Sequence, residues 1–332
     1  MTDKTLREMA LHYHRYPRPG KLSITATKPL GNQRDLALAY SPGVAAACDA
    51  IVDDPSEVAN LTVRQNLVGV ITNGSAVLGL GNIGALASKP VMEGKAVLFK
   101  KFAGIDVFDI EVDESDPDKL VDIIASLEPT FGAINLEDIK APDCFIVEKL
   151  CRERMNIPVF HDDQHGTAIV VGAAATNALH VAGKRFEDIK VVSTGGGAAG
   201  IACLDMLLKL GVRRENIWLC DIHGLVHEGR AEDMNPQKAA YGQPTDLRSL
   251  DQVIEGADLF LGLSGPGVLK PEMVARMASR PVIFALANPM PEILPEEDEA
   301  LAGPVPEEGV IVLIGRNIDG NALERSWKRF GA

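Results

Sequence analysis

Residues 189–200 read IKVVSTGGGAAG, and this stretch decides the fold of the second half of the chain. Its first six residues are mostly apolar or β-branched, which predicts a strand that ends at the glycines. The glycines follow the G-x-G-x-x-G spacing, and a helix is expected from Ile201 to Leu210. Glycines at these positions let the backbone approach a pyrophosphate, whose charge is favoured at a helix N-terminus.

An acidic residue follows at the distance that a dinucleotide site requires. A second strand is expected over residues 216–220 and ends at Asp221, where a carboxylate takes the ribose hydroxyls. We therefore predict a Rossmann-type NAD(P)-binding domain. Residues 222–224 include no Arg or Lys to meet a 2′-phosphate, which favours NAD over NADP. The candidate cofactor-binding residues are Gly195, Gly196, Gly197, Ala198, Ala199, Gly200 and Asp221.

Adjacent carboxylates stand upstream of this domain, between an expected strand at 157–160 and a helix at 167–182. These are Asp162 and Asp163, and a second pair, Glu137 and Asp138, follows another apolar run. Three carboxylates within ~4 Å repel by ~4 kcal/mol per pair at an effective dielectric of ~20. A divalent cation would remove this repulsion, and all-oxygen ligation suits Mg²⁺ or Mn²⁺. The alternative is that the acids occupy separate solvated turns.

The first half alternates strands (106–112 and 131–136) with helices (117–127 and 143–155). This alternation predicts an α/β domain with a mostly parallel sheet. We place an N-terminal substrate and metal domain at 1–160 and the NAD(P)-binding domain at 161–332.

Three further residues are candidates because of their positions. Lys95 is expected at an element boundary, since residues 96–99 read as a strand. Pro90 is expected to interrupt the helix that would follow the glycine-rich run at 79–84. Tyr40 is expected to end an extended segment before Ser-Pro-Gly, and Asn288 follows an expected strand at 282–287. The alternatives are a solvated lysine, a half-buried tyrosine and an ordinary Asn-Pro turn.

Residues 67–72 and 76–80 read as a hairpin around Asn73-Gly74, and the glycine-rich run at 79–84 reads as a tight turn.

The composition restricts the possible partners. With 46 acidic and 33 basic residues, the formal charge is -13, which argues against binding to nucleic acid or anionic membranes. The 332 residues suggest two domains, and the five cysteines lack CxxC spacing and read as reduced residues of a cytoplasmic protein. We find no apolar signal core and expect no membrane span.

Several motifs together resemble the malic enzymes, particularly the shorter bacterial type. They are AYSPGV at 39–44, GLGNIG at 79–84, EGK at 93–95, NLED at 135–138, FHDDQHGTA at 160–168 and ANP at 287–289. The resemblance covers roughly residues 10–316.

The resemblance implies oxidative decarboxylation of malate to pyruvate and CO₂ with reduction of NAD(P)⁺. It also implies that Glu137, Asp138 and Asp163 hold Mn²⁺ or Mg²⁺. By the same resemblance Lys95 takes the hydroxyl proton, Tyr40 protonates C3 of enolpyruvate, Asp162 pairs with Lys95, and Asn288 holds the substrate. The family's association favours a homodimer.

The chain departs from the family pattern at Ala76, where larger members have a substrate-binding arginine, and after Arg316. The second departure makes the NAD(P)-binding domain look truncated. Two alternatives therefore stay open. One is an oxaloacetate decarboxylase or related 2-hydroxyacid oxidoreductase, and the other is an inactive NAD-binding remnant.

Overall fold

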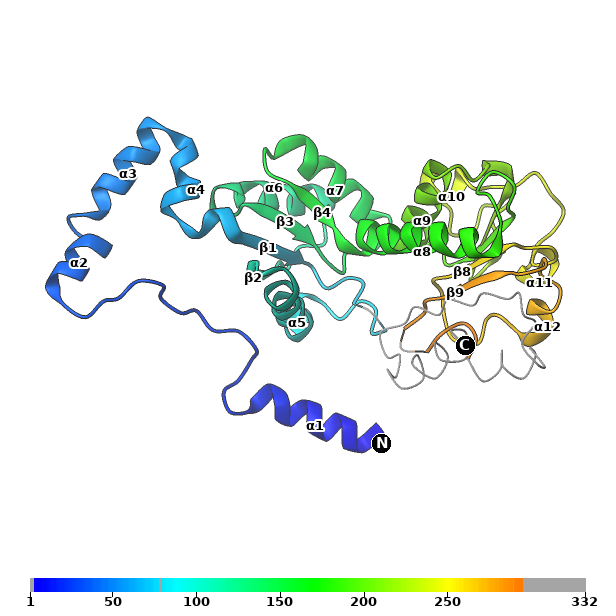
Figure 1. The fold of residues 1–332 in the computed structure, drawn as a ribbon, viewed down its shortest axis with the longest axis horizontal. Helices are drawn as coiled ribbons and strands as arrows, with labels where there is room; N and C mark the ends of the chain where they lie inside the picture. The colour runs from blue at the N-terminus through cyan, green and yellow to red at the C-terminus, as the bar shows by residue number, and fades with distance from the viewer. Residues whose placement is uncertain (1–2, 78, 289, 295–332) are drawn as a thin grey trace. The chain divides into compact units, whose positions relative to one another are not determined.

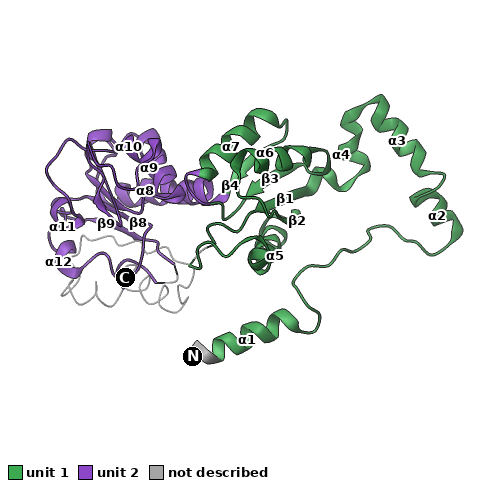
Figure 2. Ribbon diagram, turned by 180° about the vertical axis from the view of Figure 1, so that it is seen from behind, with its two compact units in different colours: residues 1–139, 143–161 green, residues 140–142, 162–332 purple. Residues whose placement is uncertain are grey.

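A computed structural model describes residues 3–77, 79–288 and 290–294. The chain forms two compact units, coloured separately in Figure 2. The first comprises residues 1–139 and 143–161, and the second comprises residues 140–142 and 162–332. The predicted departure after Arg316 lies outside the described residues.

The first unit contains a four-stranded sheet in the order β2-β1-β3-β4 with every neighbouring pair parallel. Its strands are β1 (Leu67–Thr72), β2 (Asp106–Glu111), β3 (Ala133–Leu136) and β4 (Val159–His161). The connecting helices are α5 (Ala85–Ala103), α6 (Pro117–Ser126) and α7 (Asp143–Arg154). Figure 1 shows α5 on one side of this sheet and α6 and α7 on the other. Helices on both faces account for the strongly apolar interior strand β1.

The predicted hairpin at Asn73-Gly74 is wrong, because β1 has parallel neighbours on both sides. The backbone at Gly74 instead closes a loop onto the later glycine-rich turn. The carbonyl of Gly74 accepts hydrogen bonds from the N–H groups of Ile83 and Gly84, at 3.2 and 3.1 Å. A parallel neighbour requires a crossover connection, and this loop begins it.

The strand predicted after Lys95 is also wrong, since Lys95 lies in the middle of α5. Pro90 stands inside this helix and does not end it. An interior proline removes one helical hydrogen bond. Packing compensates, because Met92 and Ala96 are buried where α5 covers the sheet.

The N-terminal segment is helical: α1 (Asp3–Arg15), α2 (Gln33–Ala39), α3 (Val44–Asp53) and α4 (Val58–Leu61). The extended segment predicted before Tyr40 is therefore wrong, and Tyr40 is the C-cap of α2. No residue of α2 or α3 is buried. The window Gln33–Asp53 has the length and hydropathy of a membrane span, contrary to our expectation. It is divided between two helices, which makes it weak evidence for a span.

The second unit is built on a five-stranded sheet in the order β7-β6-β5-β8-β9. Its strands are β5 (Val191–Thr194), β6 (Ile217–Asp221), β7 (Gly224–Leu225), β8 (Leu259–Gly262) and β9 (Val282–Ala285). Among the described strands of this sheet, only the short edge strand β7 is antiparallel to its neighbour. The chain order reverses between β5 and β8, which is where open α/β sheets bind ligands. The predicted Rossmann-type fold is confirmed.

The α-helices of this unit among the described residues are α8 (Thr167–Ala182), α9 (Ala198–Lys209), α10 (Pro236–Ala239), α11 (Leu250–Val253) and α12 (Pro271–Val274). Helices α8 and α9 pack closely, because an added Cβ at Gly172 would lie 3.0 Å from Met206. One hydrophobic core includes Val192, Phe260 and Ile283, which are paired in register on three neighbouring strands. This packing fixes the strand ends from which the loops of the site extend.

Candidate functional site

The glycine loop between β5 and α9 requires glycine at two positions for steric reasons. A Cβ at Gly195, where φ is +102°, would lie 2.3 Å from the carbonyl oxygen of Leu263. A Cβ at Gly200 would lie 1.9 Å from the carbonyl oxygen of Gly195. Side chains are thereby excluded where the loop turns into the helix, and the loop leads directly to the N-terminus of α9, where Gly197 is the N-cap.

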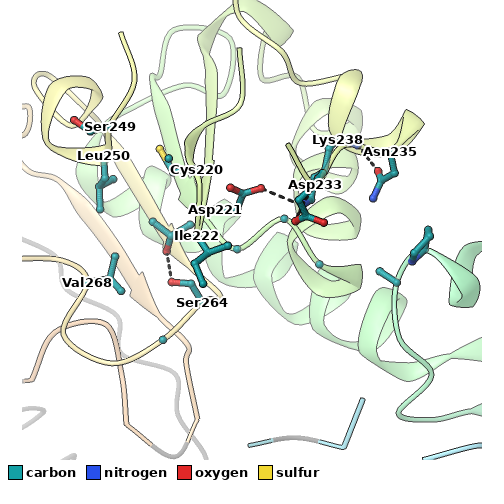
Figure 3. A pocket seen from close by; sticks show the side chains of 18 residues that line it. Cys220, Asp221, Ile222, Asp233, Asn235, Lys238, Ser249, Leu250, Ser264 and Val268 are labelled. Carbon is teal, nitrogen blue, oxygen red and sulfur yellow. Dashed lines mark hydrogen bonds and ion pairs between the residues drawn. The ribbon is translucent and has the colours of Figure 1, made fainter. Parts of the chain in front are cut away.

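A cavity of about 720 Å³ opens at this loop (Figure 3). Its lining includes Gly195, Gly196 and Gly197, the end of β6 at Asp221, and Ser264 after β8. The volume falls within the range of small-molecule sites, roughly 300–1,000 Å³. The volume of this cavity and the glycines that line it are those expected of a dinucleotide site.

Asp221 is a buried carboxylate with three donors. Its Oδ1 accepts the N–H of His223 at 2.9 Å, and its Oδ2 accepts Arg230 and, at 3.0 Å, Lys238. Burial by itself would raise the pKa of Asp221, but these hydrogen bonds from Arg230, His223 and Lys238 together hold its pKa below the ordinary value. Asp221 is therefore ionised at neutral pH.

Sequence reasoning missed both cations beside Asp221. Arg230 and Lys238 stand nine and 17 residues further along the chain. Spacing carried no signal for them, because the fold of the intervening segment alone brings them back. Lys238 also crosses the glycine loop, since a Cβ at Gly196 would lie 2.8 Å from its Cε.

A third missed residue is Glu292, a fully buried glutamate. Its carboxylate accepts the N–H of Ser264 at 2.8 Å and the N–H of Ala287 at 3.0 Å. It therefore ties together the loops that follow β8 and β9. The predicted substrate residue, Asn288, is partly buried and directly follows Ala287.

The carboxylates predicted to hold a cation lie close together. Glu137 and Asp138 directly follow β3 and are buried, and Asp163 follows β4 by two residues. Each offers an oxygen within 4.8 Å of the other two. Asp138 has a φ of +54°, a conformation that Asp tolerates better than most residues. A set of carboxylate oxygens alone is the chemistry that fits Mg²⁺ or Mn²⁺.

Lys95 reaches the same strand end from α5. Its Nζ lies 3.0 Å from Oε1 of Glu137, and the lysine side chain is only 11% exposed. The other carboxylate oxygen of Glu137 accepts the side-chain amide of Asn135, also at 3.0 Å. Helix α5 thus places an ammonium group beside a candidate metal ligand.

The two remaining catalytic candidates, Asp162 and Tyr40, lie on different elements. Asp162 begins the π-helical turn Asp162–Gly166, where a Cβ at Gly166 would lie 2.5 Å from Asp162 Oδ1. Tyr40 is 72% exposed at the end of α2. The hydroxyl of Tyr40 is therefore not held in place by burial within the described part of this chain.

The fold and the glycine loop define the second unit as a Rossmann-type dinucleotide-binding domain. Two family models match the chain: "Malic enzyme, N-terminal domain" at residues 19–116 and "Malic enzyme, NAD binding domain" at residues 164–303. The chain belongs to the malic enzyme family, which confirms the resemblance drawn from its motifs.

Individual relatives are similar over most of this chain. An NAD-dependent malic enzyme of Rhizobium meliloti is 67% identical over 87% of this chain. An NADP-dependent malic enzyme of Escherichia coli is 62% identical over 88% of this chain. The chain spans 38% and 39% of the lengths of these two relatives. The crystal structure of an NAD-dependent malic enzyme from Thermotoga maritima, 45% identical, superimposes with a TM-score of 0.85 over 93% of this chain and 81% of that one.

Proposed function

We propose that this chain catalyses the oxidative decarboxylation of malate to pyruvate and CO₂, with reduction of NAD⁺ or NADP⁺. The observation that carries this proposal is the group of three carboxylates, Glu137, Asp138 and Asp163, with Lys95 bound to the first of them. The NAD-binding domain and the relatives named malic enzymes support it.

In this proposal Glu137, Asp138 and Asp163 hold Mg²⁺ or Mn²⁺. When bound, such a cation supplies a Lewis acid for oxygens of the substrate. In its neutral amine form, which a nearby cation favours over the ammonium, the Nζ of Lys95 takes the proton of the malate hydroxyl while hydride leaves C2 for the nicotinamide. Its position 3.0 Å from Glu137 supports this role, because the base then stands beside the proposed cation site.

The later steps use three further residues. After loss of the C4 carboxylate, the hydroxyl of Tyr40 gives a proton to C3 of the enol. Asp162 pairs with Lys95 and orients it, and the Asn288 amide donates a hydrogen bond to a substrate carboxylate. The glycine loop from Gly195 to Gly200, with Asp221, holds the dinucleotide.

The test is an absorbance assay of the reduced nucleotide with malate, Mn²⁺ and either NAD⁺ or NADP⁺. We expect turnover with at least one nucleotide and its loss when EDTA removes the cation. Replacing Lys95 by Ala is expected to lower kcat by at least about 100-fold, as for loss of a general base. Lys101→Ala, an exposed lysine of the same helix, is the matched control and should keep its activity.

The outcomes separate the parts of the mechanism. Turnover that persists without any divalent cation would overturn the metal site. Near wild-type turnover of Lys95→Ala would overturn the base assignment while leaving the nucleotide site intact.

We also propose that the chain acts as a homodimer in the cytoplasm. The cytoplasmic location is supported by the five cysteines, which are free thiols, as is usual in a reducing compartment.

The homodimer is supported by apolar side chains of α2 and α3 that are exposed to solvent, including Leu38 at 66% and Val52 at 79% exposed. Such a surface is normally covered by a partner. Sedimentation equilibrium should give twice 35.5 kDa for the chain and a lower mass for Leu38→Asp/Val52→Asp. A wild-type monomer at all concentrations would contradict the dimer.

A further inference from the structure

Lys238 has all three of its ammonium hydrogens engaged by protein acceptors. Its Nζ donates to Asp221 Oδ2 at 3.0 Å, to the carbonyl oxygen of Asp233 at 2.8 Å, and to the carboxylate of Asp233. An ammonium group has three donors, so this set saturates it. Figure 3 shows Asp221, Asp233 and Lys238 gathered at one side of the nucleotide cavity.

The two carboxylates on Lys238 are not equivalent. The side chain of Asp221 is 7% exposed and also binds Arg230, whereas the side chain of Asp233 is 58% exposed. Both aspartates and Lys238 line the cavity. An anion that reaches Lys238 from the cavity therefore displaces the carboxylate of Asp233 more easily than that of Asp221.

The charges around this lysine are balanced. Lys238 and Arg230 supply two positive charges, and Asp221 and Asp233 supply two negative charges. A 2′-phosphate brought next to Asp221 on the adenosine ribose would meet no net positive charge while Asp233 stays in place. Without the Asp233 carboxylate, the group carries one positive charge and one free ammonium donor.

We propose that Asp233 is a specificity-determining residue, which occupies the Lys238 ammonium and so disfavours dinucleotides that carry a 2′-phosphate. This inference rests on the proposed nucleotide site and names its cofactor preference. The backbone of Asp233 also indicates a specialised position, because its φ is +51° and few residues other than Gly, Asn and Asp adopt that conformation.

The test is a fluorescence titration of the full chain with NADH and with NADPH, in the absence of malate and divalent cation. Asp233→Asn removes the charge and keeps a residue that tolerates positive φ. We expect the Kd for NADPH to fall about tenfold and the Kd for NADH to stay within about twofold, at fixed ionic strength.

Two further variants control for other effects. Glu232→Gln removes the same charge from the neighbouring exposed residue, which does not line the cavity, and should leave both Kd values unchanged. In a Lys238→Gln background, Asp233→Asn should no longer improve NADPH binding, because the ammonium that it frees is gone. Thermal unfolding of each variant verifies that it is folded.

An unchanged ratio of the two Kd values in Asp233→Asn would overturn the role of Asp233 and leave the nucleotide site standing. This includes the case in which both Kd values fall equally, because an equal fall would indicate a general charge effect. If the wild-type chain bound neither nucleotide, the proposed site itself would be wrong, and this inference with it.

Discussion

Asp221 shows how a single residue in this protein depends on its neighbours. A carboxylate at the end of the second Rossmann strand is expected to face the ribose, yet here one oxygen already binds Arg230 and Lys238. All three side chains are at most 7% exposed. Removing one partner from a buried ion pair typically costs about 3–5 kcal/mol, so Asp221 stabilises the fold as well as the site.

Asp221→Asn should therefore lower the free energy of unfolding by about 3 kcal/mol at pH 7. Burial raises the pKa of Asp221, but the hydrogen bonds that its carboxylate accepts lower the pKa by more. The pKa therefore lies below its ordinary value. A depressed pKa stabilises the fold above the unfolded-state pKa of about 3.9, and this contribution is lost as pH falls through the lower folded-state value. Urea unfolding at pH 7, 5 and 3 checks this.

The difference between wild type and Asp221→Asn should be similar at pH 7 and 5 and smaller at pH 3. A difference that stays the same at pH 3 would mean that ionised Asp221 is not the source of the stability.

At the scale of elements, the unit β5–loop–α9 combines two kinds of glycine. Gly200 lies in α9 against the backbone of the loop, whereas a Cβ at Gly197 meets nothing within 4 Å. The first therefore serves helix–strand packing, and the second leaves space at the cavity.

Gly200→Ala should destabilise the fold by about 1–3 kcal/mol, because the new Cβ would lie 1.9 Å from the carbonyl oxygen of Gly195 and the backbone must shift. Gly197→Ala is the matched control, since its φ of −84° suits any residue and the Cβ has room. The urea midpoints of the two variants decide the matter. Equal midpoints would show that the close approach at Gly200 is not constraining.

At the scale of the whole molecule, the two units each bury their own core, and four of the five cysteines contribute to these cores. Burial raises the pKa of Cys151 to about 11 and the pKa values of Cys203 and Cys220 to about 12. Because the thiolate is the reactive form, these groups are inert in the folded chain at neutral pH.

A thiol-reactive chromogenic disulfide at pH 8 should therefore modify no more than one cysteine in the folded chain, the exposed Cys48, and all five in denaturant. The buried thiols should react on the order of 100-fold more slowly than an ordinary one. The variant Cys48→Ser is expected to abolish the rapid reaction. Rapid modification of two or more thiols in the native protein would contradict the packing of these cores.

The sequence by itself determined the features that depend on local pattern. The strand and glycine loop at 189–200 predicted the Rossmann-type domain, and the helix predicted at 167–182 matches α8. Local periodicity and chain stereochemistry are sufficient for such elements. The motifs around Glu137, Asp138 and Asp163 helped to identify the family.

Only the tertiary structure decided what long-range packing controls. Lys95 reads locally as the residue before a strand, but the parallel sheet needs a covering helix there, and burial of Met92 and Ala96 stabilises that helix. Arg230 and Lys238 give no sequence signal, because their meeting with Asp221 depends on how the segment after β6 folds back. Residues that are distant along the chain meet only when a whole core has formed, and no local pattern encodes that meeting.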